Sequence, residues 1–237
     1  MNRITDVVKS LIIINVIMFI GTAMLPSEVR SMLALYFPLS DSFQPFQLVT
    51  HMFMHAESSL FHIAFNMYAL YLFGSALENL WGSKRFLFYY LFCGIGAAGF
   101  YLLIKYFEYQ NAVSLIDPQM VEVITKEGND VIMRGQNYSN DALAQLNGIL
   151  HIPMLGASGA VFGLLAGYGM KFPNNELGIF PLPFFIKAKY FVLIYGAIEL
   201  SLGLSSYNTG IAHFAHLGGA IFGFFLIMYW NKFGSRL

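Results

Sequence analysis

Long apolar runs without a single Asp, Glu, Lys or Arg constrain this chain more than any other feature of its sequence. Three of them cover residues 10–27, 58–77 and 86–104. Each is close to the ~20 mostly apolar residues that a helix needs to cross a membrane. Charged residues make up only 11% of the 237 residues, against roughly 25% in a soluble domain, and the runs do not alternate as barrel strands do. The sequence therefore predicts an all-α membrane protein.

We expect a single membrane domain over residues 1–237, built as a bundle of six transmembrane helices. Pro153 and Gly156 break the fourth apolar run. A long outer segment, about residues 106–151, separates the third and fourth helices. The six expected spans are about 10–27, 58–80, 86–105, 154–172, 189–206 and 210–231.

The distribution of basic residues predicts the orientation of this bundle. With a cytoplasmic N-terminus, nine of the thirteen Lys and Arg residues fall on the cytoplasmic side and four fall outside, which follows the positive-inside rule. Both the N- and C-termini are therefore expected in the cytoplasm. The thirteen acidic and thirteen basic residues cancel, so the chain has no net basic field to attract nucleic acid, and a nucleic-acid partner is not expected.

Two short elements are expected in the outer segment. Residues 121–125 and 131–133 flank the sequence EGND at 127–130, which predicts a β-hairpin. Residues 141–146 predict a short helix that is capped by Asn140 or Asp141 and stopped at Asn147-Gly148.

Six polar or ionisable residues lie inside the apolar runs, where they are costly and are functional candidates by default. A helix from Ser158 to Met170 is about 20 Å long at ~1.5 Å per residue, too short for a hydrocarbon core about 30 Å thick. Ser158 should therefore lie roughly 10 Å below the outer surface, after irregular backbone that is tolerated only inside protein or beside a wet cavity. The alternative is an ordinary N-cap serine. The six residues are His62, Asn66, Ser158, Glu199, His213 and His216.

Three expected helices bring polar side chains to the depth of Ser158. His216 lies about six residues into the last helix from its outer end, which places it near that depth. His62 and Asn66 are four residues apart, so they share one face of the second helix. A single buried histidine is usually a core residue whose ring is hydrogen-bonded to its neighbours. Polar residues at one shared depth on three helices favour a functional site instead.

Glycines at four-residue spacing predict close contact between the fourth and sixth helices. Small residues at this spacing let membrane helices touch backbone to backbone. Such contact would bring Ser158 close to His216. The glycines are Gly159, Gly163 and Gly167 in the fourth helix and Gly219 and Gly223 in the sixth.

A serine within hydrogen-bond reach of a histidine is a nucleophile with its general base. The amide of Asn66, the ring of His62 and the backbone N–H of Ser158 are available donors for the oxyanion of a tetrahedral intermediate. A catalytic triad would need an Asp or Glu at the depth of Ser158 and His216. No carboxylate lies there unless Glu199 does, so a Ser–His dyad is the favoured interpretation. The indicated reaction is hydrolysis of peptide bonds inside the membrane.

Three motifs resemble those of the rhomboid intramembrane serine proteases. Residues 156–159, GASG, match the GxSG motif of that family. Residues 216–219, HLGG, with Gly223 beyond them, resemble its last-helix histidine motif, and residues 62–66, HIAFN, resemble its HxxxN. The resemblance implies an endopeptidase without metal or cofactor that acts on transmembrane proteins in the lipid bilayer. It implies Ser158 as the nucleophile, His216 as the base, and His62 and Asn66 in the oxyanion hole.

The same resemblance implies supporting roles. Phe162 would pack on the catalytic histidine, and Glu78 and Arg85 would form a structural acidic–basic pair. Phe46-Gln47 departs from the Trp-Arg that many members carry in the first outer loop. The supporting positions within the site are Gly156, Gly159, Phe162 and Gly219.

Alternatives to these interpretations stay open. An inactive rhomboid-like protein that escorts membrane proteins would usually lack the serine or the histidine. A metal permease could use His213 and His216, but Ser158 would then be idle. Glu199 is expected as a protonated carboxyl group bonded to a neighbouring helix, or as part of a gate. A start unlike a transit peptide and the lack of a seventh span favour a bacterial plasma membrane.

Overall fold

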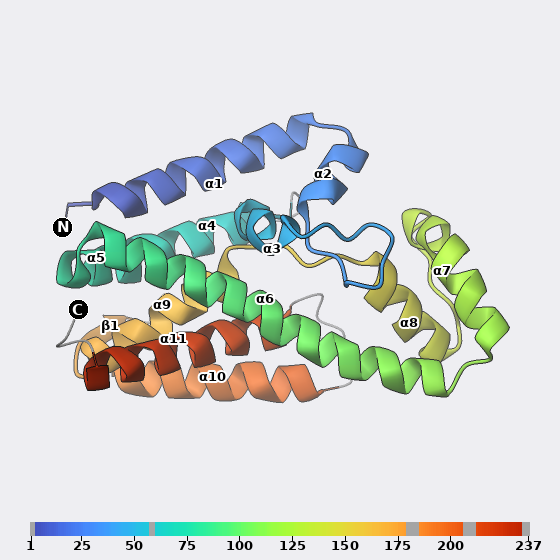
Figure 1. Cartoon of the computed structure of the whole chain (residues 1–237). Helices are drawn as coiled ribbons and strands as arrows, with labels where there is room; N and C mark the ends of the chain where they lie inside the picture. Colours follow the sequence, from blue (N-terminus) through green and yellow to red (C-terminus); the bar gives the residue numbers. More distant parts are fainter. Residues whose placement is uncertain (1–2, 57–59, 179–184, 206–211, 234–237) are drawn as a thin grey trace.

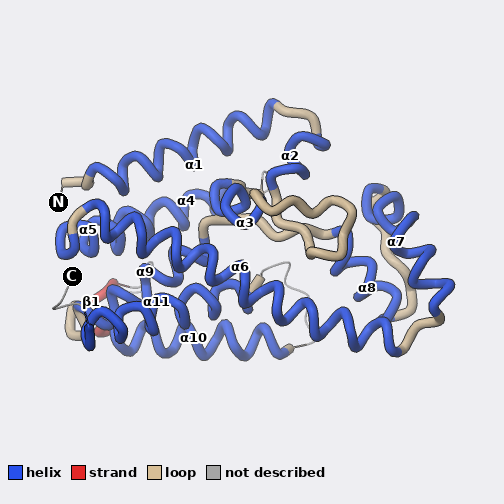
Figure 2. Tube along the Cα trace, viewed as in Figure 1, coloured by secondary structure: helices blue, strands red, loops and turns tan. Residues whose placement is uncertain are grey.

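The computed structural model describes residues 3–56, 60–178, 185–205 and 212–233, and these are mostly helical (Figure 2). One antiparallel pair of short strands, β1 (Glu176–Gly178) and β2 (Phe185–Lys187), precedes the tenth helix. The helical elements are α1 (Asp6–Met24), α2 (Ser27–Leu33), α3 (Gln47–Thr50), η1 (His51–Phe53), α4 (Leu60–Ala69), η2 (Leu70–Gly74), α5 (Ser75–Trp81), α6 (Ser83–Ser114), α7 (Pro118–Met133), α8 (Asp141–His151), α9 (Ser158–Lys171), α10 (Ala188–Leu204) and α11 (His213–Phe233).

Four helices among the described residues are long and apolar enough to cross a membrane: α1, the continuous helix Leu60–Trp81, α6 and α11. The helical membrane class is thereby confirmed. A total of six spans stays a prediction, because α9 has 14 residues and α10 has 17. The expected span ends at residues 58, 206 and 210 lie outside the described residues.

The short helix α9 forms the centre of the bundle. Its residues 159–169 are all buried, and it packs mainly against α11 and α6, with α4, η2, α5 and α10 also in contact. Figure 1 shows α9 between α4–α5 on one side and α10–α11 on the other. The start of α9, with Ser158, therefore lies inside the bundle, although Ser158 itself is only partly buried.

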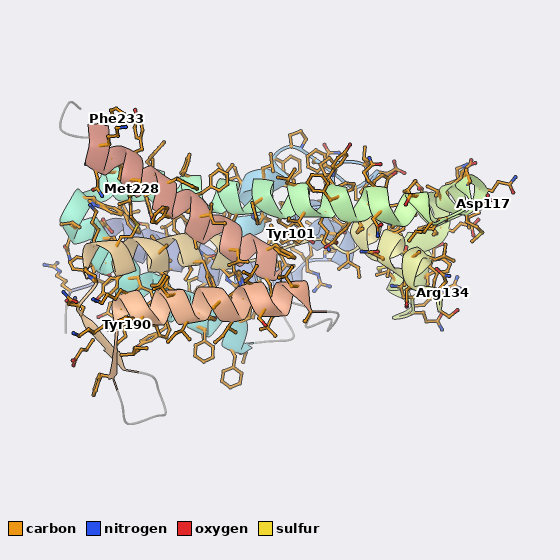
Figure 3. The ribbon with its side chains drawn as sticks, turned by 90° about the horizontal axis from the view of Figure 1, so that it is seen from below. Tyr101, Asp117, Arg134, Tyr190, Met228 and Phe233 are labelled. Carbon is orange, nitrogen blue, oxygen red and sulfur yellow. The ribbon has the colours of Figure 1, made fainter. Side chains whose placement is uncertain are left out.

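Helix α6 is longer than the expected 86–105 and carries the chain away from the bundle. Within it, Lys105 Nζ lies 2.7 Å from a carboxylate oxygen of Glu108, one helical turn further on. Helices α7 and α8, which we call the outer cap, pack on its far end through a separate cluster that contains Ala112, Ile124 and Leu146. In Figure 3, Asp117 and Arg134 mark this end of the molecule.

The expected hairpin over 121–133 is wrong, because these residues belong to α7. Asp117 caps that helix by accepting a hydrogen bond from the Gln119 backbone N–H, and Pro118 is its first residue. Ile124 and Gly128, four residues apart, are its buried positions, which is helical spacing. The second outer element is helical as expected and is capped by Asn140, but α8 continues past Asn147-Gly148 to His151.

Candidate active site

Ser158 lies at the start of α9, directly after a stretch of irregular backbone. Met154 pairs with Leu35 in an isolated β-bridge, and the Gly156 backbone N–H donates to the His51 carbonyl oxygen at 2.9 Å. Gly156 has φ +129°, a conformation that favours glycine. Ala157 occupies the N-cap position without a side-chain cap bond, so the alternative that Ser158 is an N-cap serine is wrong.

The hydroxyl group of Ser158 contacts the ring of His216. The Oγ–Nε2 distance is 2.8 Å, and His216, on α11, is 8% exposed. The ring of Phe162, one helical turn after Ser158, stacks on the His216 ring with centroids 4.2 Å apart and planes 6° apart. This stack restricts rotation of the imidazole and keeps Nε2 directed at the serine.

Glycines make this contact possible because α9 and α11 approach backbone to backbone. A Cβ atom on Gly219 would overlap the carbonyl oxygen of Gly159, and one on Gly223 would lie 3.1 Å from the carbonyl oxygen of Gly163. The Tyr89 hydroxyl donates to the Gly163 carbonyl oxygen at 2.8 Å. The expected close contact between these two helices is present in the structure.

His62 and Asn66 lie on α4 and line the same cavity as Ser158 and His216. The cavity has a volume of about 2060 Å³ and extends to the outer cap. A Cβ atom on Gly156 would meet the His62 ring at 3.3 Å and Ser158 Oγ at 3.6 Å, so the ring and the hydroxyl lie on the same side of the loop. One N–H of the Asn66 amide donates to the His62 carbonyl oxygen at 2.8 Å, and the amide has a second N–H.

Glu199, on α10, joins this group of residues. Its Oε2 lies 3.0 Å from His216 Nδ1 and 2.7 Å from His213 Nδ1. The expected bond to a neighbouring helix is therefore present, whereas these distances do not test the expected protonated state. Counting from the helix ends places the two residues at a similar depth, because Glu199 lies five residues before the end of α10 and His216 three residues after the start of α11. Within the described residues, these three side chains form the one group whose possible metal-ligand atoms all lie within 4.8 Å of one another.

The expected pair between Glu78 and Arg85 is wrong. Glu78 accepts hydrogen bonds from the Thr5 hydroxyl, from the Ser83 hydroxyl at 2.7 Å and from the Val8 backbone N–H at 3.0 Å. The guanidinium of Arg85 lies over the Trp230 ring, 4.1 Å from its centroid. The carboxylate thus holds the first turn of α1 and the start of α6, where backbone N–H groups lack helical partners.

Comparison with known proteins agrees with the motifs in this site. The family model described as Rhomboid domain matches residues 42–233, which is most of the chain. The chain therefore belongs to the rhomboid family.

Named relatives share just over a quarter of their aligned residues with the chain. The mitochondrial presenilin-associated rhomboid-like protein of Homo sapiens is 28% identical over 178 residues, which cover 73% of this chain and 35% of the relative. The Bos taurus protein of the same name is also 28% identical over 178 residues, which cover 73% of this chain and 36% of that relative. Rhomboid protease AarA of Providencia stuartii is 27% identical over 177 residues, which cover 73% of this chain and 51% of AarA. The match thus spans about a third of the mitochondrial relatives and about half of AarA.

Proposed function

We propose that this member of the rhomboid family is an intramembrane serine endopeptidase that hydrolyses peptide bonds in or near transmembrane segments of membrane proteins. The observation that carries the proposal is the 2.8 Å contact between Ser158 Oγ and His216 Nε2. It lies at the wall of a large cavity inside an apolar helical bundle. The relative AarA, which is named a rhomboid protease, supports the same reaction class.

The reaction would run through an acyl-enzyme. Ser158 Oγ attacks the carbonyl carbon of the substrate peptide bond while His216 Nε2 takes the hydroxyl proton. His216 then gives that proton to the leaving amine as the C–N bond breaks, and the acyl group stays on Ser158. Water, deprotonated by His216, attacks the acyl ester, which releases the carboxylic acid and returns the proton to Ser158.

Donors for the oxyanion come from two elements. The backbone N–H of Ser158 is in the first turn of α9, where N–H groups lack helical partners. The His62 ring and the second N–H of the Asn66 amide complete the proposed oxyanion hole, since both residues line the cavity beside Ser158. Donors held in place before the reaction are worth most in a site that excludes bulk water.

The proposal includes one membrane domain of six spans with both termini in the cytoplasm. This orientation rests on the distribution of Lys and Arg described above. Labelling of single introduced cysteines with a membrane-impermeant maleimide tests the orientation. Labelling of the outer cap from the cytoplasmic side would contradict it.

Helix α8 of the outer cap and the loop before it are proposed to contact substrate. Asn137, Asp141 and Gln145 belong to the cap or to the loop between its helices, and they line the same cavity as Ser158. A chain segment that enters the cavity from outside would therefore pass these polar side chains. Replacing Asn137 and Gln145 together by Ala should change the relative cleavage of different substrates. Unchanged cleavage across a substrate panel would contradict the proposal.

The test of the main proposal is cleavage of a single-span reporter by purified protein in lipid. Ser158→Ala and His216→Ala should abolish cleavage, and Ser158→Ala should abolish labelling by a fluorophosphonate probe. Ser114→Ala, at the exposed end of α6, is the matched serine control and should keep both activities. A wild-type protein that leaves every reporter uncut and Ser158 unlabelled would overturn the proposal and favour a non-catalytic escort.

A further inference from the structure

A buried carboxylate lies on the side of the His216 ring opposite the serine. Ser158 Oγ contacts Nε2 at 2.8 Å, while Glu199 Oε2 contacts Nδ1 at 3.0 Å. Glu199 is 4% exposed. The serine hydroxyl, the imidazole and the carboxylate thus form one continuous chain of hydrogen bonds across three helices, α9, α11 and α10. We propose that Glu199 is a positioning residue that makes a triad of the proposed Ser158–His216 dyad, an assignment that rests on the proposed function.

The physical reason lies in the tautomer of His216. Glu199 Oε2 lies within hydrogen-bond distance of two ring nitrogens, and a carboxylate oxygen can accept from both. The Nδ1 atoms of His213 and His216 then carry the protons. A neutral imidazole protonated at Nδ1 has its lone pair on Nε2, and Nε2 is the atom that faces Ser158. The carboxylate therefore selects the one neutral form of His216 that can accept the serine proton.

His213 holds the carboxylate in place from a second direction. It lies three residues before His216 on α11, and the two rings are nearly perpendicular, at 87°. Its Nδ1 contacts the same Glu199 oxygen at 2.7 Å. Two ring nitrogens on the same oxygen restrict rotation of the Glu199 carboxylate. His213 thus acts on His216 through Glu199.

Hydrogen bonding explains these distances better than a shared metal ion does. Zn²⁺ binds imidazole nitrogen and carboxylate oxygen at about 2.0–2.2 Å, which separates neighbouring tetrahedral ligand atoms by about 3.3 Å. The observed separations of 2.7 and 3.0 Å are shorter and fall in the range of N–H···O hydrogen bonds in proteins, about 2.7–3.2 Å. The three residues have suitable donor atoms for zinc, so the experiment includes that outcome.

The carboxylate comes from a helix that is otherwise weakly buried. The buried residues of α10 are Ala188 and Glu199, whereas Leu193 is 69% exposed. Figures 1 and 3 show α10 beside α11 at one side of the bundle. A displacement of α10 away from α11 would break the Glu199–His216 bond before it disturbed the contact between Ser158 and His216. The triad is therefore complete only when α10 is docked on α11.

The experiment compares Glu199→Gln with wild type in lipid by reporter kinetics and by fluorophosphonate labelling of Ser158. The amide keeps the size of the side chain, but its NH₂ group can donate to Nδ1 and stabilise the wrong tautomer. We expect kcat and the labelling rate to fall about 100-fold or more, within the up to ~10⁴-fold that loss of a triad carboxylate costs. KM and the final extent of labelling should stay near wild type. Glu122→Gln, on the exposed face of α7, is the matched control and should keep the wild-type rates.

A second measurement reads the tautomer without relying on catalysis. Histidine ¹⁵N NMR should show His216 protonated at Nδ1 in wild type and a larger share of Nε2–H in Glu199→Gln, with the signal assigned from a His216→Gln sample. His213→Asn should reduce the labelling rate less than Glu199→Gln does, because His213 is hydrogen-bonded to the carboxylate and not to a nitrogen of His216. An equal or greater reduction would overturn that order.

Each remaining result is decisive. A wild-type labelling rate or an unchanged His216 spectrum in Glu199→Gln would overturn the assignment. So would a loss of activity matched by an equal loss in labelling extent, since that shows damage to the fold. Inactivation by a chelator with recovery on adding Zn²⁺ would replace it with a metal centre. A wild-type protein that neither cleaves nor labels would refute the proposed protease function, while the NMR result would still decide whether Glu199 sets the tautomer.

Discussion

Gly219→Ala should inactivate the protein by separating α9 from α11. The added Cβ would overlap the carbonyl oxygen of Gly159, well inside the 3.0 Å that real Cβ atoms keep, so the helices must move apart by about 1 Å or more. Gly159 follows Ser158, and Gly219 lies one turn beyond His216. A shift of that size stretches the 2.8 Å Oγ–Nε2 contact beyond hydrogen-bond range. A misplacement of about 1 Å can cost about 100-fold in rate, or about 3 kcal/mol in the barrier.

The assay is the rate of fluorophosphonate labelling of Ser158, with thermal unfolding in lipid or detergent to confirm that the variant is folded. Gly99→Ala is the matched control, because nothing lies within 4 Å of a Cβ at that position of α6. It should label at the wild-type rate. A folded Gly219→Ala protein that also labels at the wild-type rate would refute the reasoning, since the helices would then tolerate the methyl group without moving the dyad.

Three further predictions follow from contacts around the site. Phe162→Ala removes the ring stacked on His216, a contact worth roughly 1 kcal/mol, and should slow labelling up to about tenfold; an unchanged rate would argue against orientation by the stack. Burial lowers the pKa of His51 from 6.5 to about 4, so protonating this ring in acid opposes folding. The free energy of unfolding is unaffected above pH 6.5 and falls by about 3 kcal/mol as the pH drops from 6.5 through 4. Thermal unfolding of His51→Gln should show a smaller loss of stability in acid than wild type, and an equal loss would contradict this. Ile124→Ala should lower the stability of the outer cap by about 2–5 kcal/mol. Proteolysis between residues 115 and 140 should then be faster, while the fluorophosphonate still labels Ser158; an unaltered digestion rate would count against a packed cap.

Much of the candidate site could be predicted from the sequence because membrane depth can be counted along a helix. The charge-free runs indicated a helical membrane protein, and Pro153 and Gly156 indicated that the fourth helix starts inside it. The glycine spacing indicated contact between the fourth and sixth helices, which places Ser158 beside His216. These features depend on neighbours in the sequence and on a fixed rise per residue, so one chain suffices to infer them.

The outer cap shows where local patterns mislead. Apolar residues at 121–125 and 131–133 suited two short strands, yet they form one helix that begins at an Asp-Pro cap. The side of α7 that buries Ile124 packs on residues of α6 and α8. Packing against α6 and α8 favours the helix. The sequence pattern alone does not decide, because β and α spacing are hard to distinguish in segments this short. The cap signal at Asp117-Pro118 was present in the sequence and was the better guide.

Only the tertiary structure decided which polar groups meet. The sequence left Glu199 as a carboxyl group bonded to some neighbour, and it gave no reason for Glu78 to bind α1 instead of Arg85. The structure brings Glu199 against His216 Nδ1 and Glu78 against the first turn of α1. Helical periodicity fixes which residues share a face and a depth, whereas hydrogen-bond partners depend on the rotation and separation of whole helices, which many distant contacts set together.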